Sequence, residues 1–190
     1  MSQHSLSQDH KLTLLQIAEN TIEQALSSGK AATLDVSGYP PPLRAPQATF
    51  VTLKINCLLR GCIGTLEAVR PLALDVCHNA YGAAFTDPRF SPLEREEFKQ
   101  LSISLSLLSA LQPMDCASEE DVIAQLRPGI DGLLLEADRM HRSTFLPAVW
   151  DDLPHPREYL RQLRRKAGLA PDYWSDSLRV YRYTTEIIVR

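Results

Sequence analysis

Apolar residues at helical spacing mark two long segments in the first half of the chain. From Asp9 to Ser27 they recur every three or four positions, the pattern of an amphipathic helix, and Gly29 beyond them predicts its end. A second helix is predicted over Arg70 to Phe85, with Pro71 in its first turn. This helix is expected to end before Asp87-Pro88, because the residue before a proline avoids the helical region.

Alternation with a period of two predicts the strands. Between Leu101 and Ser109 the residues Leu and Ile alternate with Ser, which predicts a strand with one apolar face and one wetter serine face. Two β-rich runs, Ala48 to Lys54 and Cys57 to Thr65, have only Ile55-Asn56 between them and are expected to pair as an antiparallel hairpin.

Shorter elements follow in the second half. Ser118 with Asp121 resembles a capping box, which predicts a short helix closed by Pro128-Gly129. The other expected elements are strands over Gly132 to Glu136 and Ser143 to Val149, a helix over Pro156 to Gly168 and a closing strand over Leu178 to Val189. There is no repeated βαβ period and no glycine-rich dinucleotide fingerprint. The pattern therefore predicts an α+β fold, a mostly antiparallel mixed sheet with covering helices.

Glycine and proline interrupt the chain before the first strand. The run Gly38 to Pro46 holds five residues of these two types, which denies regular hydrogen bonding and predicts an extended surface loop. Because such a loop leaves backbone groups unpaired, we expect it to be available to a partner protein.

Composition and charge narrow the class of protein. The chain has 190 residues, 44% of them hydrophobic, enough to bury a core without disulfides or a metal. Its 20 Lys and Arg against 23 Asp and Glu give a net charge of −3, which argues against general nucleic-acid binding. No segment has the ~20 apolar residues of a membrane helix or the pattern of a secretory signal. The 4 cysteines fit a reducing compartment, so we expect a cytoplasmic protein that does not contact membranes.

The segment Leu59 to Thr65 is the strongest candidate for chemistry. In a regular strand Arg60, Cys62 and Gly64 share one face, and an arginine beside a cysteine favours the reactive thiolate. Glycines inside a strand mark a bulge or a place where a ligand or another backbone comes close. The alternative is that Cys62 is a small buried residue and that Gly61 and Gly64 serve a tight strand crossing.

Several short motifs along the chain belong together. They are Arg60-Gly61-Cys62-Ile63-Gly64-Thr65, Arg70-Pro71-Leu72, Ala83 through Phe90, Ser104 through Ser109, Gly129 through Leu133, Thr144 through Trp150, Lys166 through Leu169 and Val180 through Tyr183. In this order they resemble the AMMECR-type domain family, whose bacterial members are called AmmeMemoRadiSam system protein A. The resemblance spans about Leu12 to Thr184.

The resemblance implies an AMMECR-like α+β fold of two fused lobes. We expect one domain over residues 1–190, with a polar N-terminal tail over 1–8 and a smaller lobe within about 110–175. The family's bacterial name implies a Memo-like protein and a radical S-adenosylmethionine protein as partners. The family does not supply an established reaction.

Candidate catalytic residues surround the cysteine motif. Cys62 would act as a nucleophile beside His78, with Glu67 or Asp75 orienting that base. His78 follows Cys77 at positions where the family pattern has Ala or Glu, so this base would be particular to the present chain.

The segment Asp87 through Phe90 has two interpretations. Asp87 could form a general acid/base pair with Glu67. Alternatively, it accepts local backbone hydrogen bonds in a turn while Arg89 pairs with a carboxylate.

Metal ligands are not expected. A structural zinc site begins with two ligands two to four residues apart, and Cys57, Cys62 and Cys77 are not so spaced. Adjacent Cys77 and His78 point about 100° apart on a helix. We therefore expect no metal and no cofactor.

The last predicted helix carries arginines on one flank. They are Arg157, Arg161, Arg164 and Arg165. Such a flank suits a phosphate or an acidic partner; the alternative is an ordinary solvated face with Glu158 nearby.

Two hypotheses for function follow. The first is an enzyme or enzyme component that acts on a small anionic metabolite, together with the two partner proteins. Its cleft would contain the catalytic residues Cys62, Glu67 and His78 and the substrate-binding residues Arg60, Gly61, Gly64, Asn79 and Arg89. The alternative is a non-catalytic adaptor or scaffold that contacts those partners through the Gly38 to Pro46 segment and the arginine flank.

Overall fold

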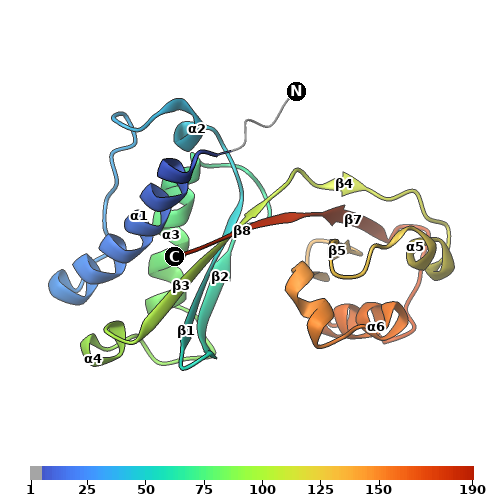
Figure 1. Cartoon of the computed structure of the whole chain (residues 1–190). Coiled ribbons are helices and arrows are strands. Elements are labelled where there is room, and N and C mark those ends of the chain that lie inside the picture. Colours follow the sequence, from blue (N-terminus) through green and yellow to red (C-terminus); the bar gives the residue numbers. More distant parts are fainter. Residues whose placement is uncertain (1–5) are drawn as a thin grey trace. The chain divides into compact units, whose positions relative to one another are not determined.

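The computed structural model describes residues 6–190 and divides the chain into two compact units (Figure 1). The first unit contains the chain up to Leu108 together with Glu186–Arg190, and the second contains Ser109–Thr185. Residues 1–5 of the tail expected over 1–8 lie outside the described residues. Each unit combines helices with a four-stranded, mostly antiparallel sheet, which confirms the predicted α+β fold.

The first unit is a sheet with helices on one face. Its elements are α1 (Gln8–Ser28), α2 (Pro41–Arg44), β1 (Thr49–Ile55), β2 (Leu58–Gly64), α3 (Leu72–Phe85), α4 (Arg95–Phe98), β3 (Leu101–Leu108) and β8 (Thr185–Val189). The strand order is β2-β1-β3-β8, and α1 and α3 pack on the sheet and on each other (Figure 1). Strand β1 pairs antiparallel with both β2 and β3, which confirms the predicted hairpin.

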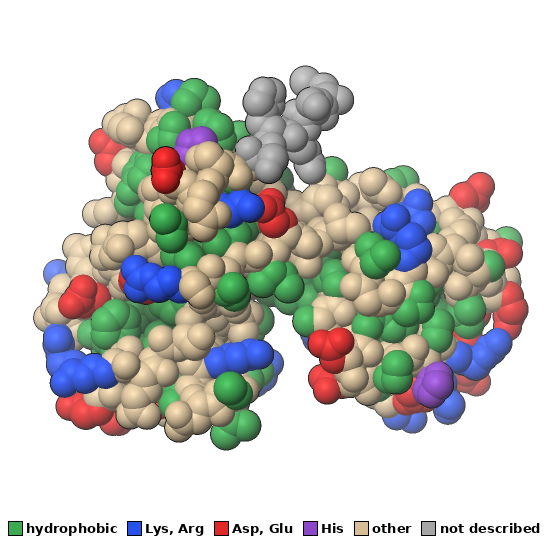
Figure 2. Space-filling view, in the orientation of Figure 1, with side chains coloured by type: hydrophobic (Ala, Val, Ile, Leu, Met, Phe, Trp, Pro, Cys, Tyr) green, Lys and Arg blue, Asp and Glu red, His purple; other side chains and the backbone are tan. Residues whose placement is uncertain are grey.

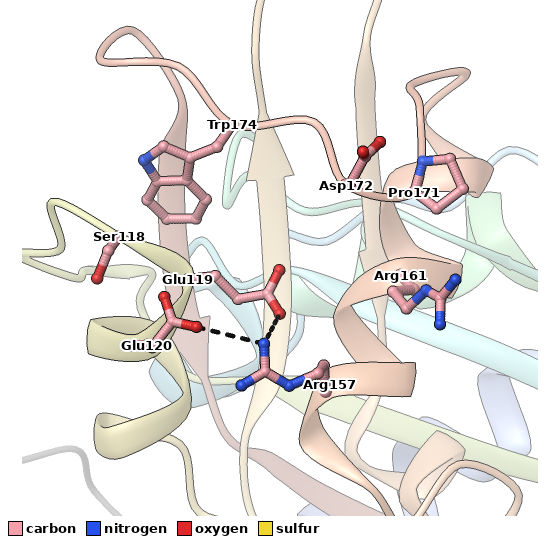
Figure 3. Close-up of a pocket in the computed structure, with 8 residues that line it drawn as sticks. All are labelled: Ser118, Glu119, Glu120, Arg157, Arg161, Pro171, Asp172 and Trp174. Atoms are coloured by element: carbon pink, nitrogen blue, oxygen red, sulfur yellow. Dashed lines mark hydrogen bonds and ion pairs between the residues drawn. The ribbon is translucent and has the colours of Figure 1, made fainter.

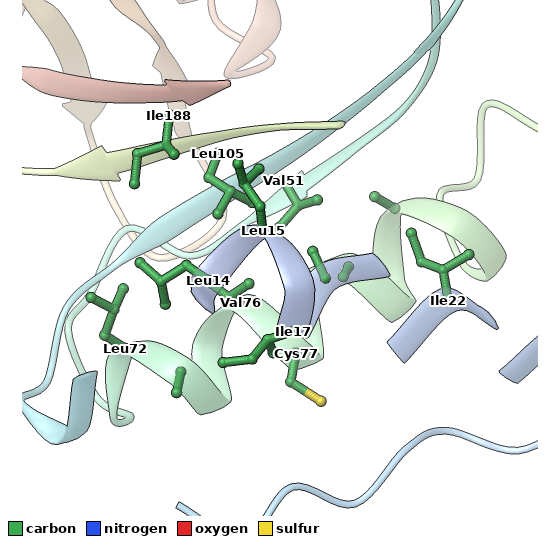
Figure 4. Packing of buried hydrophobic residues seen from close by; sticks show 14 of the residues in the cluster. Leu14, Leu15, Ile17, Ile22, Val51, Leu72, Val76, Cys77, Leu105 and Ile188 are labelled. Atoms are coloured by element: carbon green, nitrogen blue, oxygen red, sulfur yellow. The ribbon is translucent and has the colours of Figure 1, made fainter. Parts of the chain in front are cut away.

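The core of the first unit lies between the sheet and its two long helices (Figure 4). Leu14 and Ile22 of α1, Val76 of α3 and Val51 of β1 are completely buried there. Each such side chain contributes roughly 1.5–3 kcal/mol when it leaves water. Packing of amphipathic faces, rather than helix propensity alone, therefore stabilises this layer.

Helix α1 is capped at both ends by the expected types of residue. The Ser7 hydroxyl accepts a hydrogen bond from the His10 backbone N–H at 3.2 Å. At the other end Gly29 adopts a left-handed conformation with φ 69°, which glycine does without steric cost. The predicted helix is confirmed.

The prediction of an extended loop over Gly38 to Pro46 is wrong in its centre. Residues Pro41–Arg44 form the one-turn helix α2, since a proline in the first turn presets the helical φ. Leu43 is buried and anchors this turn. The carbonyl oxygen of Ala45 accepts a hydrogen bond from the Leu72 N–H at 2.9 Å, so part of the segment's backbone is already paired.

The turn of the first hairpin is shifted by one residue from the predicted position. Its two residues are Asn56 and Cys57, with φ 51° and 65°, and Ile55 pairs with Leu58 on either side. Two left-handed residues in a two-residue loop match the twist of the adjoining strands. Cys57 is therefore an exposed turn residue, not the start of β2.

The second unit is built around a separate core. Its elements are β4 (Gln112–Pro113), α5 (Glu119–Gln125), β5 (Gly132–Glu136), β6 (Arg142–Phe145), the 3-10 helix η1 (Pro147–Asp151), α6 (Pro156–Lys166) and β7 (Arg179–Tyr183). The strand order is β4-β7-β5-β6. Trp150 and Tyr159 stack in the core with ring centroids 3.9 Å apart. The Ser118 hydroxyl accepts from the Asp121 N–H at 3.2 Å and caps α5 as predicted.

Two strand predictions in this half are wrong in extent. The strand expected over Ser143 to Val149 ends at Phe145, because Pro147 begins a 3-10 helix. The closing strand expected over Leu178 to Val189 is two strands, β7 and β8, which belong to different sheets. Between them Thr184 donates its N–H to the hydroxyl of Ser109 at 2.9 Å instead of continuing a ladder.

Substitution of Cys57 by glycine is expected to stabilise the hairpin. A left-handed conformation costs a non-glycine residue ~1–2 kcal/mol, and glycine avoids this cost. Glycine loses more conformational entropy on folding, which offsets ~0.5–1 kcal/mol of the gain. Cys57→Gly should therefore raise the free energy of unfolding by roughly 0.5–1 kcal/mol in urea titrations. Cys57→Val is the control and should lower it, because a β-branched residue resists positive φ.

Candidate functional site

The sheet of the first unit has one face toward its helices and one face away from them. Leu105 in β3 is buried against the helices, whereas Ser102 is exposed and Ser104 is half-buried, which confirms the predicted wetter face. Across the strands Cys62 pairs with Thr52, and Thr52 pairs with Ser104. Paired residues point to the same side of a sheet, so the Cys62 side chain lies on this serine face.

Cys62 is half-buried, and three of its atoms have polar partners. Its Sγ lies 3.2 Å from Oγ1 of Thr52. Its backbone N–H donates to Oδ2 of Asp87 at 2.8 Å, and its carbonyl oxygen accepts from Nη2 of Arg89 at 3.1 Å. Strand β2 lies at the edge of the sheet, so Asp87 and Arg89 pair backbone groups that have no neighbouring strand. We refer to Asp87 and Arg89 together as the clamp.

The clamp joins a buried carboxylate to a half-exposed arginine. Nη2 of Arg89 lies 2.7 Å from Oδ2 of Asp87, and Nε lies 2.9 Å from Oδ1. The Asp87 side chain is 2% exposed and that of Arg89 is 53% exposed. The hydrogen bond from Arg89 outweighs burial and, with that from the Cys62 backbone, lowers the pKa of Asp87 to about 2. The Arg89 N–H also donates to Asp87 at 3.1 Å, which confirms the local-turn interpretation.

The two glycines of the motif are explained by packing. A Cβ on Gly61 would overlap the carbonyl oxygen of Ala83 in α3, and one on Gly64 would overlap the ring of Phe50. The helix backbone therefore comes close to β2 at Gly61, as the tight-crossing alternative predicted. Packing therefore accounts for both glycines, and their proposed contact with a substrate stays a prediction.

Arg60 is paired with a residue that the sequence did not point to. Its Nε and Nη2 donate to the two carboxylate oxygens of Glu97 at 2.7 and 2.9 Å. This bidentate pair lowers the pKa of Glu97 and raises that of Arg60. The Arg60 side chain is only 12% exposed, and its guanidinium lies 5.8 Å from the centroid of the Phe90 ring. Its charge is thus balanced within the first unit.

Asn79 belongs to a buried network around Asp75. Asp75 accepts from the Thr49 backbone N–H at 3.0 Å, from the Thr65 hydroxyl at 2.8 Å and from Nη2 of Arg70 at 2.9 Å. Nδ2 of Asn79 donates to the same carboxylate at 2.9 Å. Asp75 and Asn79 are both buried, so Asn79 holds the network together. Its proposed substrate contact stays a prediction.

His78 and Glu67 are exposed and are not hydrogen-bonded to Cys62. The His78 side chain makes no hydrogen bond or ion pair with any residue from 6 to 190. The structure therefore does not assemble a hydrogen-bonded triad from Cys62, His78 and Glu67. Their catalytic roles stay predictions.

The arginine flank of α6 is not uniformly solvated. Arg164 is buried and donates to Glu119 of α5 at 2.5 Å. Arg157 is exposed and pairs with Glu119 and Glu120 at 3.0 and 3.3 Å. The interpretation of the whole flank as a solvated face is wrong for Arg164, because its partner lies on another helix.

Charged side chains of both signs share the surface. On the described part of the face drawn in Figure 2, basic and acidic side chains are interspersed. Within residues 6–190 no group of three His, Cys, Asp or Glu is placed to hold a metal ion. No helix in that range is long and apolar enough to cross a membrane.

Comparison with known proteins gives consistent matches over nearly the whole chain. Residues 15–188 match the AMMECR1 family. A protein of Methanothermobacter thermautotrophicus is 36% identical over 188 residues, covering 96% of this chain and 95% of the relative. A protein of Thermofilum pendens is 34% identical over 200 residues, covering 97% and 91%. The crystal structure of the uncharacterized protein PH0010 from Pyrococcus horikoshii has a TM-score of 0.84 at 31% identity, covering 92% of this chain and 88% of that chain.

The α+β architecture places the chain in the same structural class as PH0010. The fold of the two units is that of PH0010, matched over most of both chains. The chain belongs to the AMMECR1 family, which confirms the resemblance drawn from its motifs.

Substitution of Gly61 by alanine is expected to destabilise the first unit. The new Cβ would overlap the Ala83 backbone, which cannot move without shifting α3. Forced overpacking of this kind costs about 1–3 kcal/mol or more, so the urea midpoint should fall clearly. Gly38→Ala is the matched control, since a Cβ there meets nothing within 4 Å. Equal midpoints for the two variants would contradict the close contact.

Because of the clamp, we expect the free energy of unfolding to fall as the pH is lowered below about 4. Because the pKa of Asp87 is lowered from 3.8 to about 2, its contribution is complete above pH ~4 and disappears as pH falls toward 2. The shift corresponds to about 2 kcal/mol. Asp87→Asn should therefore lower the free energy of unfolding at pH 6 and flatten its decline between pH 4 and 2.

The control for this measurement is Glu96→Gln, an exposed carboxylate of the same unit with no hydrogen bond to a described residue. It should retain the wild-type decline below pH 4. If the free energy of unfolding of Asp87→Asn fell between pH 4 and 2 as steeply as that of the wild type, the clamp would not be the cause of the decline.

Proposed function

We propose that the chain is a component of an enzyme system and holds a small anionic metabolite on the serine face around Cys62. The observation that carries this proposal is the clamp. This charged pair binds both backbone groups of Cys62: Asp87 accepts from its N–H, and Arg89 donates to its carbonyl oxygen. An edge strand can be protected by far simpler means, such as a charged side chain or a proline. A fixed thiol is what a nucleophile or a substrate contact requires.

Arg89 supplies the charge that an anion would meet. Its Nε and Nη2 are used by Asp87 and the Cys62 carbonyl oxygen, whereas Nη1 has no hydrogen bond to a described residue. With about half of the side chain exposed, this nitrogen is able to donate to a carboxylate or phosphate beside Cys62. Arg60 is less suited to this role, because Glu97 already takes two of its nitrogens.

A partner is expected to supply part of the chemistry. The Cys62 thiol has the Thr52 hydroxyl as its hydrogen-bond partner and no base within the described residues. The family resemblance suggests a Memo-like protein and a radical S-adenosylmethionine protein as those partners. The four free thiols support a reducing, cytoplasmic location for such a system.

The alternative is an adaptor that only docks these partners. Exposed apolar side chains on edge strand β8 favour it: Ile187 and Val189 are exposed, whereas Ile188 between them is in the core. Alternation along a strand places Ile187 and Val189 on the serine face. Apolar residues at an exposed edge are suited to protein contacts.

Reconstitution tests the enzymatic proposal. The purified chain is combined anaerobically with a Memo-like protein, a radical S-adenosylmethionine protein, S-adenosylmethionine, a reductant and a small-metabolite extract, and anions are followed by mass spectrometry. We expect an anionic metabolite to be consumed only when this chain is present. Cys62→Ser should reduce that consumption at least tenfold, and Cys57→Ser, which changes an exposed turn thiol, should not.

The outcomes separate the two functions. Full consumption with Cys62→Ser would overturn the role of the thiol and support the adaptor, provided that the chain is still required. Consumption that does not require the chain would overturn both.

A further inference from the structure

A pocket lies in the second unit and contains none of the residues assigned to the site around Cys62. It has a volume of about 530 Å³ and is bordered by the start of α5, the exposed side of α6 and the loop before β7 (Figure 3). Pockets of this size accommodate small molecules. All of its lining residues belong to Ser109–Thr185, so the pocket is formed by one unit alone.

The walls of this pocket are fixed by the buried Arg164. Its Nη1 donates to Glu119 of α5 at 2.5 Å and to the carbonyl oxygen of Pro171 at 2.9 Å. Its guanidinium also lies 5.8 Å from the centroid of the Trp174 ring. One cation thus ties together the helix and the loop that face each other across the opening, and it is 1% exposed. A pocket held in this way exists before a ligand arrives.

Most of the charges in the lining are balanced by one another. Arg157 pairs with both Glu119 and Glu120 (Figure 3). Glu119 also pairs with Arg164. A ligand that displaced these contacts would leave charged groups without partners.

Two charges of opposite sign remain for a ligand. Arg161 has a loose contact with Glu158 on its own helix, at 3.7 Å, and its side chain is half exposed. Asp172 is exposed and makes no hydrogen bond or ion pair with any described residue. Figure 3 shows Arg161 on α6 and Asp172 on the loop across from it. The lining therefore offers one cation and one anion.

The loop that carries Asp172 also supplies an apolar part of the lining. The half-buried indole of Trp174 and the ring of Pro171 come from the same loop as Asp172. The indole is held in place because Nε1 of Trp174 donates to the carbonyl oxygen of Ala117 at 3.0 Å. A fixed indole offers a flat surface to an aliphatic or aromatic group.

We infer that this pocket binds a free α-amino acid with an apolar side chain. The ligand carboxylate would pair with Arg161, its ammonium group with Asp172, and its side chain would lie on Trp174 and Pro171. A simple anion would meet Arg161 but bring its charge toward Asp172 and Glu120, and a simple cation would meet the arginines. A zwitterion matches both Arg161 and Asp172, whereas a ligand of a single charge meets one of them and opposes the other.

The test uses the intact chain and L-phenylalanine as the probe. The two indole N–H signals of ¹⁵N-labelled protein report separately, since Trp174 borders the pocket and Trp150 is buried in the core. We expect saturable movement of the Trp174 signal and none of the Trp150 signal. The probes 3-phenylpropionate, which lacks the ammonium group, and phenethylamine, which lacks the carboxylate, should each bind at least tenfold more weakly.

Variants test whether Arg161 and Asp172 bind the charged groups of the ligand. Arg161→Ala and Asp172→Asn should each weaken L-phenylalanine binding at least tenfold, and the matched control Arg165→Ala, an exposed arginine of the same helix outside the pocket, should leave it unchanged. Cys62→Ser should also bind normally, so this result is independent of the proposed enzymatic function. An unmoved Trp174 signal, equal binding of either singly charged probe, or equal loss in Arg165→Ala would overturn the inference.

Discussion

The buried carboxylate of Asp75 is the constraint on which the first unit depends. A carboxylate removed from water costs several kcal/mol unless its oxygens are matched by donors. Thr49 brings a donor from the start of β1, and Thr65 brings one from the residue after β2. Arg70 and Asn79 add donors from before and within α3. Four parts of the chain must therefore meet at one point before this charge can be buried.

The position of α3 then determines which face of β2 stays uncovered. The helix backbone lies so close to Gly61 that Ala83 leaves no room for a side chain there. Cys62, the next residue, must point to the other face. The helix ends at Phe85, and the chain leaving it carries Asp87 to the Cys62 N–H. The clamp is thus a consequence of where α3 packs. The same packing requires a glycine at position 61 and leaves the Cys62 thiol on the opposite face of β2.

Periodicity predicted the elements of the fold because its signal is local, and it did not predict contacts that are distant in the sequence. The alternation of residues over Leu178 to Val189 would look the same in one long strand as in two short ones. The interruption between β7 and β8 depends on a hydrogen bond from the Thr184 N–H to Ser109, 75 residues earlier. In the candidate site, alternation placed Cys62 and Gly64 on one face of β2, but it did not predict the shift of register at Arg60, which has no partner residue in β1. The pairing of Arg60 with Glu97, 37 residues later, leaves no pattern in either segment.

Burial decides which arginines of this acidic chain are structural and which remain available. Arg60 and Arg164, 12% and 1% exposed, each pair with a carboxylate distant in sequence. A ligand could take such a guanidinium only by displacing a partly buried carboxylate from its charged partner. Arg89 and Arg161, 53% and 50% exposed, keep part of the guanidinium in contact with water. In each unit, therefore, one arginine is largely shielded from water beside its carboxylate, and another keeps an exposed guanidinium that a ligand can reach.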